Sequence, residues 1–310
     1  MSDMSNSNGR SLLERAAEMY DFGAALRGPA PVPAPAPVQP RAEPAPAPAP
    51  QPAPVAPPVE IVRQRPAPGV AQIDRIALAE HGFIVPEDHA TSLAEEFRLI
   101  KHQLLADLEA SRQPEERRRL ILVCSAQPRA GKTFCAINLA LSLSGEPEVE
   151  VLLIEGDFLK PDALALLGLD AAPGFVDALA DPNSDPESFV IRTDVPGLCV
   201  LPAGRKTNNV PELLASDRSR EVLAKLVAGD RRRIILFDSP PALMASHATV
   251  LAGLVGRALV VVRADQTTEA DLRETIGLLQ GCDISLILNG AGLAVTGRKF
   301  GSYDGYGHDE

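Results

Sequence analysis

The sequence predicts an α/β fold in which helices flank a mostly parallel sheet. Short apolar, β-branched runs recur along the chain and suit strands that are buried on both faces. Segments with apolar residues at helical spacing separate these runs, and such an alternation favours a parallel sheet covered on both sides. The expected strands are 120–124, 149–154, 198–201, 234–237, 258–262 and 284–288, and the expected helices are 91–112, 132–144, 218–227, 245–256 and 269–280.

The N-terminal part of the chain does not share this alternation. Sixteen of the 29 prolines lie between Pro29 and Pro68, where they alternate largely with alanine. Such a segment lacks backbone donors and favours an extended, disordered arm. Residues 11–27 are amphipathic, and a docking helix and a frayed terminal helix remain alternatives there. The predicted parts, in order, are a short amphipathic helix, a Pro/Ala-rich linker, an α/β domain and a flexible tail, at residues 1–28, 29–69, 70–298 and 299–310.

Charge and cysteine usage exclude several classes of protein. The chain has 41 acidic and 30 basic residues and a net charge of −11, which argues against a nucleic-acid partner. Its four cysteines lack the paired spacing of a zinc site or a disulfide framework, so a reducing, cytoplasmic compartment is expected. Residues 1–10 lack the apolar core of a signal peptide. The uncharged stretch 240–256 contains two prolines and is predicted to be buried α/β structure.

A phosphate-binding loop is predicted directly after the strand 120–124. Residues 125–133 read Ser-Ala-Gln-Pro-Arg-Ala-Gly-Lys-Thr and match the P-loop pattern, except that Ala126 replaces the first glycine. In such a loop backbone N–H groups surround a phosphate at a helix N-terminus, Lys132 contacts the outer phosphate oxygens, and the Thr133 hydroxyl can bind Mg²⁺. The predicted nucleotide-binding residues are Ala126, Gln127, Pro128, Arg129, Ala130, Gly131, Lys132, Thr133 and Phe134.

Acidic residues follow two other predicted strands. Glu155 and Asp157 come after 149–154, and Asp238 comes after 234–237. The carboxyl ends of parallel strands meet at one edge of the sheet, so these acids are placed to hold Mg²⁺ beside the phosphate loop. A strand continuing through Glu155 and Asp157 would point both side chains the same way, and one could bind the metal while the other accepts a proton. A solvated charge or a helix cap is the alternative for each acid.

Together these motifs resemble the bacterial tyrosine kinase family, P-loop autokinases that regulate exopolysaccharide and capsule synthesis. The resemblance covers about residues 88–310 and is closest to the stand-alone cytoplasmic kinases of exosortase-associated export systems. It implies a P-loop NTPase architecture of the MinD/ParA type and the use of ATP and Mg²⁺. It also implies that Lys132, Glu155, Asp157 and Asp238 are catalytic, with Glu155 as the proton acceptor and with Thr133, Asp157 and Asp238 around the metal.

The C-terminal tail gains a role from the same resemblance. In the family a C-terminal tyrosine cluster is phosphorylated by a neighbouring subunit, which implies that Tyr303 and Tyr306 are the phosphoacceptors. An unreactive tail is the alternative. The family also implies a membrane partner, a chain-length determinant or polysaccharide co-polymerase with a cytoplasmic activating segment. Such a partner would recruit the kinase peripherally to the inner membrane.

Two further sets of residues resemble family positions. Glu95, Arg98 and Lys101 lie on roughly one face of a predicted helix and resemble a Glu-x-x-Arg-x-x-Arg subunit contact of a homo-oligomer, with lysine in the last place. A solvated charged face is the alternative. Asn289 stands where related ATPases contact adenine through a side-chain amide, and the alternative is a turn asparagine.

Departures from the family pattern keep two other functions open. Arg129 stands where the family usually has glycine, and Glu155 replaces an aspartate. One alternative is therefore a catalytically weak, nucleotide-bound scaffold for a membrane co-polymerase. The other is a ParA- or MinD-like ATPase switch that transfers phosphate only to water. Those ATPases carry a second lysine early in the loop, where this chain has Gln127.

Overall fold

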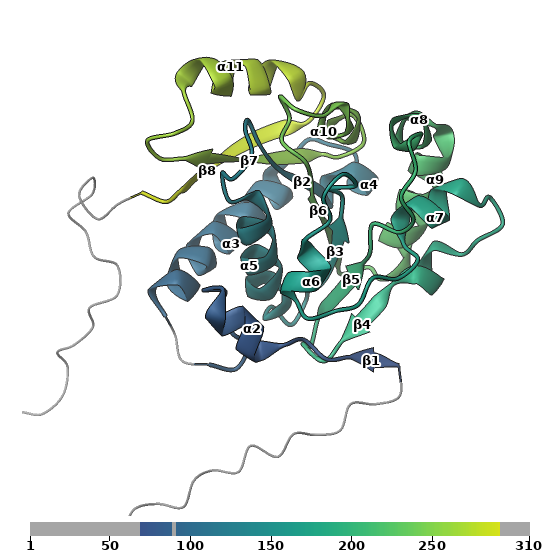
Figure 1. Ribbon diagram of the computed structural model, residues 1–310, viewed down its shortest axis with the longest axis horizontal. Coiled ribbons are helices and arrows are strands. Elements are labelled where there is room, and N and C mark those ends of the chain that lie inside the picture. The colour runs from purple at the N-terminus through teal and green to yellow at the C-terminus, as the bar shows by residue number, and fades with distance from the viewer. Residues whose placement is uncertain (1–68, 89–90, 292–310) are drawn as a thin grey trace, which may run out of the picture. The chain divides into compact units, whose positions relative to one another are not determined.

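The computed structural model describes residues 69–88 and 91–291 (Figure 1). The predicted N-terminal helix, the linker up to residue 68 and the tail 299–310 lie outside the described residues. The strands are β1 (Val70–Ala71), β2 (Leu120–Ser125), β3 (Glu150–Glu155), β4 (Ile191–Thr193), β5 (Leu198–Leu201), β6 (Arg233–Asp238), β7 (Arg257–Arg263) and β8 (Asp283–Asn289). The helices are α2 (Arg75–Glu80), α3 (Ser92–Ala110), α4 (Glu115–Arg118), α5 (Lys132–Ser144), α6 (Ala163–Leu166), α7 (Phe175–Ala180), the 3₁₀ helix η1 (Pro186–Phe189), α8 (Val210–Ala215), α9 (Asp217–Gly229), α10 (Ser246–Ala252) and α11 (Glu269–Leu278).

The strands form one mostly parallel sheet, which confirms the predicted fold class. Their order is β1-β4-β5-β3-β6-β2-β7-β8, and among the described strands only the β4–β5 pair is antiparallel. The phosphate-loop strand β2 lies between β6 and β7, and β3 lies on the other side of β6. The ends of β2, β3 and β6 therefore meet at one edge, where the sequence places Ser125, Glu155 and Asp238.

Helices cover both faces of the sheet because strand side chains alternate between them. In β2, Leu120, Leu122 and Cys124 pack with residues of α7, α8, α9 and α10. Ile121 and Val123 pack on the other face with α2, α3, α5 and α6. Figure 1 shows α3 and α5 side by side on this second face. The central strands carry apolar runs without polar alternation because each face of the sheet packs against its own core.

Every strand and helix expected from the sequence is present; β5 and α5 have the predicted ends, and the other elements have shifted ends. The helix expected over 245–256 begins at Ser246 and ends at Ala252, where Gly253 is the C-cap. The unpredicted elements are all short, because two to six residues are too few to show a period; they are β1, β4, α2, α4, α6, α7, η1 and α8. Among the described residues no helix is both long and apolar enough to span a membrane.

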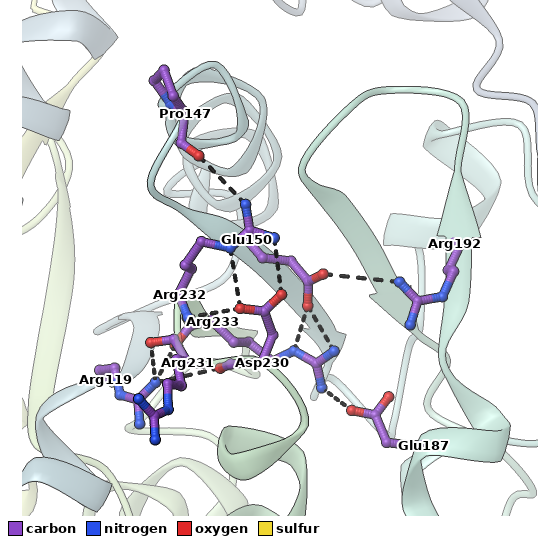
Figure 2. Close-up of polar contacts among 9 residues, drawn as sticks. All are labelled: Arg119, Pro147, Glu150, Glu187, Arg192, Asp230, Arg231, Arg232 and Arg233. Carbon is purple, nitrogen blue, oxygen red and sulfur yellow. Dashed lines mark hydrogen bonds and ion pairs between the residues drawn. The ribbon is translucent and has the colours of Figure 1, made fainter.

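A buried arginine fixes the ends of β3 and β6 that lie away from the phosphate loop (Figure 2). Arg233 is 1% exposed, and its guanidinium donates to Glu150 at 2.7 Å, to Glu187 and to the Leu226 carbonyl at 2.8 Å. Arg192 adds a longer contact to Glu150, at 3.9 Å. Because every acceptor in this network lies on a different element, the network holds β3, β6, η1 and α9 together.

Candidate nucleotide site

The phosphate loop joins β2 to α5 through two residues with left-handed backbone. Gly131 has φ +95°, which suits glycine, and Arg129 has φ +63°, which is unfavourable for a residue with a Cβ atom. The first N–H groups of α5 follow at once, and such groups have no acceptor within their own helix. The loop and the helix start therefore form the kind of N–H-lined cradle that binds phosphate.

Side-chain hydrogen bonds hold the loop from outside. The Ser125 hydroxyl donates to the Gln127 carbonyl at 2.7 Å. The Gln127 amide donates to an Asp271 carboxylate oxygen at 2.9 Å, and the Asn289 amide donates to the Ala130 carbonyl at 2.9 Å. No sequence motif pointed to Asp271 as a contact of the loop; it belongs to the capping box of α11. Its contact with the loop arises only from the packing of α11 above β7 and β8.

Three of the predicted catalytic side chains meet beside this loop. Lys132 Nζ lies 3.3 Å from Asp157 Oδ2, and both side chains are largely buried. Asp238 is 1% exposed and lies near the Thr133 hydroxyl, while its Oδ1 atom is buried without a hydrogen-bond partner. The strand-end acids and the loop residues thus form one cluster, as the sequence predicted for Lys132, Asp157 and Asp238.

Burial controls the protonation of Asp238. Loss of hydration raises the pKa of its carboxyl to about 7, and the nearby charges of Asp157 and Glu155 act in the same direction. Lys132 and the Thr133 hydroxyl favour the ionised form and oppose this rise. Without a cation, burial therefore favours the protonated form of this carboxyl more than in an exposed aspartate. A divalent cation would favour its ionised form.

Glu155 and Asp157 have different partners, and the strand predicted to continue through both does not. Strand β3 ends at Glu155, so the alternation of a strand does not continue to Asp157. The oxygens of Glu155 accept backbone N–H groups of Leu164 at 3.2 Å and Ala203 at 3.4 Å. Burial raises the pKa of Glu155, although these N–H groups oppose the rise. Glu155 therefore holds α6 and the loop after β5, and Asp157 alone faces Lys132.

The cluster fits Mg²⁺ better than a metal held by protein ligands alone. Among residues 69–88 and 91–291, no group of three or more His, Cys, Asp or Glu side chains could hold a metal ion. Magnesium often uses one or two carboxylates and completes its shell with water and substrate phosphates. The unpartnered Asp238 Oδ1, together with Asp157 and the Thr133 hydroxyl, matches that donor set.

Other predicted nucleotide-binding residues take different positions. Gln127, Pro128 and Arg129 are exposed, and Ala126 and Ala130 are buried. The Phe134 ring packs against Phe83, with ring centres 5.3 Å apart, so only its backbone can face a phosphate.

One buried residue near the cluster was not predicted. His247 in α10 is 8% exposed, its Nδ1 has no hydrogen-bond partner, and its ring centre is 5.9 Å from that of Phe158. Burial lowers its pKa, although the charges of Asp157 and Glu212 oppose this. A single histidine after two prolines carries no recognisable pattern, so only the structure could place it beside the site.

Comparison with known proteins identifies the family. No protein-family model matches the chain. EpsB of Ralstonia nicotianae, a tyrosine-protein kinase by name, is 32% identical over 167 residues, which cover 54% of this chain and 22% of EpsB. The tyrosine-protein kinase YwqD of Bacillus subtilis is 27% identical over 188 residues, which cover 61% of this chain and 76% of YwqD. The crystal structure of the VpsO kinase domain is 31% identical, with a TM-score of 0.51, and is matched over 98% of its length and 63% of this chain.

The chain belongs to the bacterial tyrosine kinase family. It spans less than a quarter of EpsB, so the similarity concerns the kinase part of that larger protein. The comparisons do not distinguish the exosortase-associated members of the bacterial tyrosine kinase family, and that finer assignment stays a prediction. Tyr303 and Tyr306 lie outside the described residues.

The predicted subunit-contact residues do not share one exposed face. Lys101 is 8% exposed, and its Nζ pairs with Glu146 of the same chain at 2.6 Å. At 3.6 residues per turn, six residues make about one and two-thirds turns, so Lys101 faces about 240° away from Glu95 and reaches Glu146 after the end of α5. Glu95 and Arg98 are more exposed and pair with each other at 2.6 Å. Their role in a bacterial tyrosine kinase oligomer stays a prediction.

Proposed function

We propose that the chain is an ATP- and Mg²⁺-dependent protein-tyrosine autokinase that regulates exopolysaccharide or capsule assembly and export. It would phosphorylate Tyr303 and Tyr306 of a neighbouring copy. The observation that carries the proposal is the cluster of Lys132, Asp157 and Asp238 beside a phosphate cradle. Kinship with named tyrosine-protein kinases supports the same reaction.

Each side chain of the cluster has a chemical part in this proposal. The loop N–H groups and Lys132 would bind the β- and γ-phosphates and balance their charge. Asp238, Asp157 and the Thr133 hydroxyl would hold Mg²⁺, which when bound neutralises charge on the phosphates. Asn289 would stand near the adenine.

The transfer requires a phenolic oxygen in line with the bond that breaks. The tyrosine oxygen would form a bond to the γ-phosphorus while the bond between the γ-phosphorus and the β,γ-bridging oxygen breaks, and ADP would leave. The phenolic proton would pass to Glu155, as the family resemblance implies. Asp157 already accepts the Lys160 N–H at 3.1 Å, pairs with Lys132 and would hold the metal. Burial raises the pKa of Glu155, which makes it a better proton acceptor than an exposed glutamate.

A nucleotide-bound scaffold is the second candidate. The left-handed backbone of Arg129 and the occupied oxygens of Glu155 favour weak chemistry in an otherwise well-formed site. In either case the family resemblance supports a membrane chain-length determinant or co-polymerase as activator, with recruitment of the kinase to the inner membrane.

Mass spectrometry after incubation with Mg-ATP tests the proposal. The full chain is compared with Lys132→Met and with the double variant Tyr303→Phe, Tyr306→Phe. We expect tail phosphate in the unmodified chain and a loss of several orders of magnitude in rate for Lys132→Met. ATP hydrolysis with an unmodified tail would indicate the ATPase switch, and binding without either reaction would indicate the scaffold. The assay includes the activating segment of the membrane partner, so that a missing activator cannot explain a negative result.

A further inference from the structure

The P-loop accepts a side-chain hydrogen bond from a residue that is distant in the sequence. Asn289 Nδ2 donates to the Ala130 carbonyl at 2.9 Å, across 159 positions of sequence. The same amide lies against the next residue, since a Cβ added to Gly131 would come within 2.0 Å of Asn289 Nδ2. Loop and amide therefore fit each other closely, and the fit needs glycine at 131.

A rigid strand end delivers the Asn289 side chain. Asn289 is the last residue of β8 and stands in register with Arg263 of β7. Its own carbonyl accepts the Ala264 N–H at 2.9 Å, so its backbone is held to the segment that follows β7. The chain then turns at Gly290, which has φ +67°. The amide is thus presented by the sheet and not by a free loop.

The same C-terminal unit contacts the loop a second time. Asp271 of α11 accepts the Gln127 amide at 2.9 Å and also the Thr268 hydroxyl at 2.7 Å. The β7–α11–β8 unit therefore forms hydrogen bonds with the loop at Gln127 and at Ala130, on either side of Arg129 with its left-handed backbone. Of the two contacts, the one at Ala130 is the better shielded, because Ala130 is 4% exposed.

The hydrogen bond to Ala130 has a direct consequence for phosphate binding. The carbonyl of Ala130 and the N–H of Gly131 belong to one planar trans peptide, so they point in opposite directions. An amide that holds this carbonyl outward turns the Gly131 N–H inward, to the side where the phosphate cradle opens. Without that amide, a buried carbonyl would lose its partner and other orientations of the peptide would become populated.

We infer that Asn289 is a positioning residue for the P-loop, acting on the triphosphate through the Ala130–Gly131 peptide and not only on the base. This inference rests on the proposed binding of nucleotide. It predicts that Asn289 affects every ligand that carries the triphosphate, with or without adenine. A residue that only contacts adenine would affect ATP alone.

Calorimetric titration of the full chain with ATP, GTP and inorganic tripolyphosphate, each with Mg²⁺, tests the inference. Asn289→Ala removes the amide, and Asn289→Leu keeps a side chain of similar size but removes the donor without adding charge. The matched control is Asn183→Ala, at an exposed asparagine outside the cluster. We expect both Asn289 variants to weaken all three ligands about tenfold, with the ratio of GTP to ATP affinity nearly unchanged, because the binding-competent loop becomes a minor population.

Several results would overturn the inference. Weaker ATP binding with unchanged tripolyphosphate binding would leave Asn289 as an adenine contact only. Unchanged binding of all three ligands, in variants whose melting temperature matches that of the parent, would remove any role for Asn289. A parent chain that binds none of the three ligands would refute the proposed function as well. Equal loss in the Asn183→Ala control would show that the effect is not specific to the loop.

Discussion

Replacing Asp238 with Asn should stabilise the nucleotide-free protein at neutral pH while it weakens Mg-ATP binding. Burial raises the pKa of Asp238 from its usual 3.8 to about 7. An acid with a higher pKa in the folded than in the unfolded state binds more protons when folded. Its contribution to stability is therefore complete below about pH 4 and is lost as the pH rises through about 7.

The size of the effect follows from the same shift. At about 1.4 kcal/mol per pH unit, the shift corresponds to a loss of at most about 4 kcal/mol between pH 4 and pH 8. Asn keeps the shape of the protonated acid and does not ionise. Relative to the protonated limit below pH 4, we therefore expect Asp238→Asn to gain about 1 kcal/mol in unfolding free energy at pH 4.5 and up to about 4 kcal/mol at pH 8.

Urea unfolding followed by circular dichroism, with EDTA present, measures this difference at pH 4.5, 6, 7 and 8. Other shifted groups, such as Glu155 and His247, are present in both proteins, so the difference reports mainly on Asp238. Mg-ATP binding by the parent should tighten from pH 6 to 8, whereas that of the variant should stay weak. A stability difference that does not change with pH would refute the reasoning.

Two further predictions concern backbone strain and the buried arginine. Arg129→Gly should raise the unfolding free energy by about 1 kcal/mol, because the residue has φ +63°, and a lower urea midpoint would contradict this. Arg233→Met should cost about 3–5 kcal/mol, since it leaves the 7% exposed Glu150 carboxylate buried with only the distant Arg192. The double variant Arg233→Met, Glu150→Met should recover much of that lost unfolding free energy in the same assay. If the double variant is as unstable as Arg233→Met alone, lost packing and not the unpaired charge causes the destabilisation.

Contiguous patterns determined much of the fold and part of the candidate site. The apolar runs of β2, β3 and β6, the helix after the Gly131-Lys132-Thr133 turn and the acid after β6 each lie within a few consecutive residues. A period or a motif of that length can be recognised before the chain folds. Parallel strands also bring their carboxyl ends to one edge, so the meeting of Lys132 with Asp238 could be expected.

Only the tertiary structure decided how the remaining side chains are used. Asn289 reaches Ala130, and Lys101 finds Glu146, because strands and helices from distant parts of the chain pack together. Glu155 binds backbone N–H groups because β3 stops at that residue. Such contacts depend on where an element ends and on which neighbour lies there. A local sequence pattern predicts neither the end of an element nor its neighbour, because the packing of the whole sheet decides which groups form hydrogen bonds.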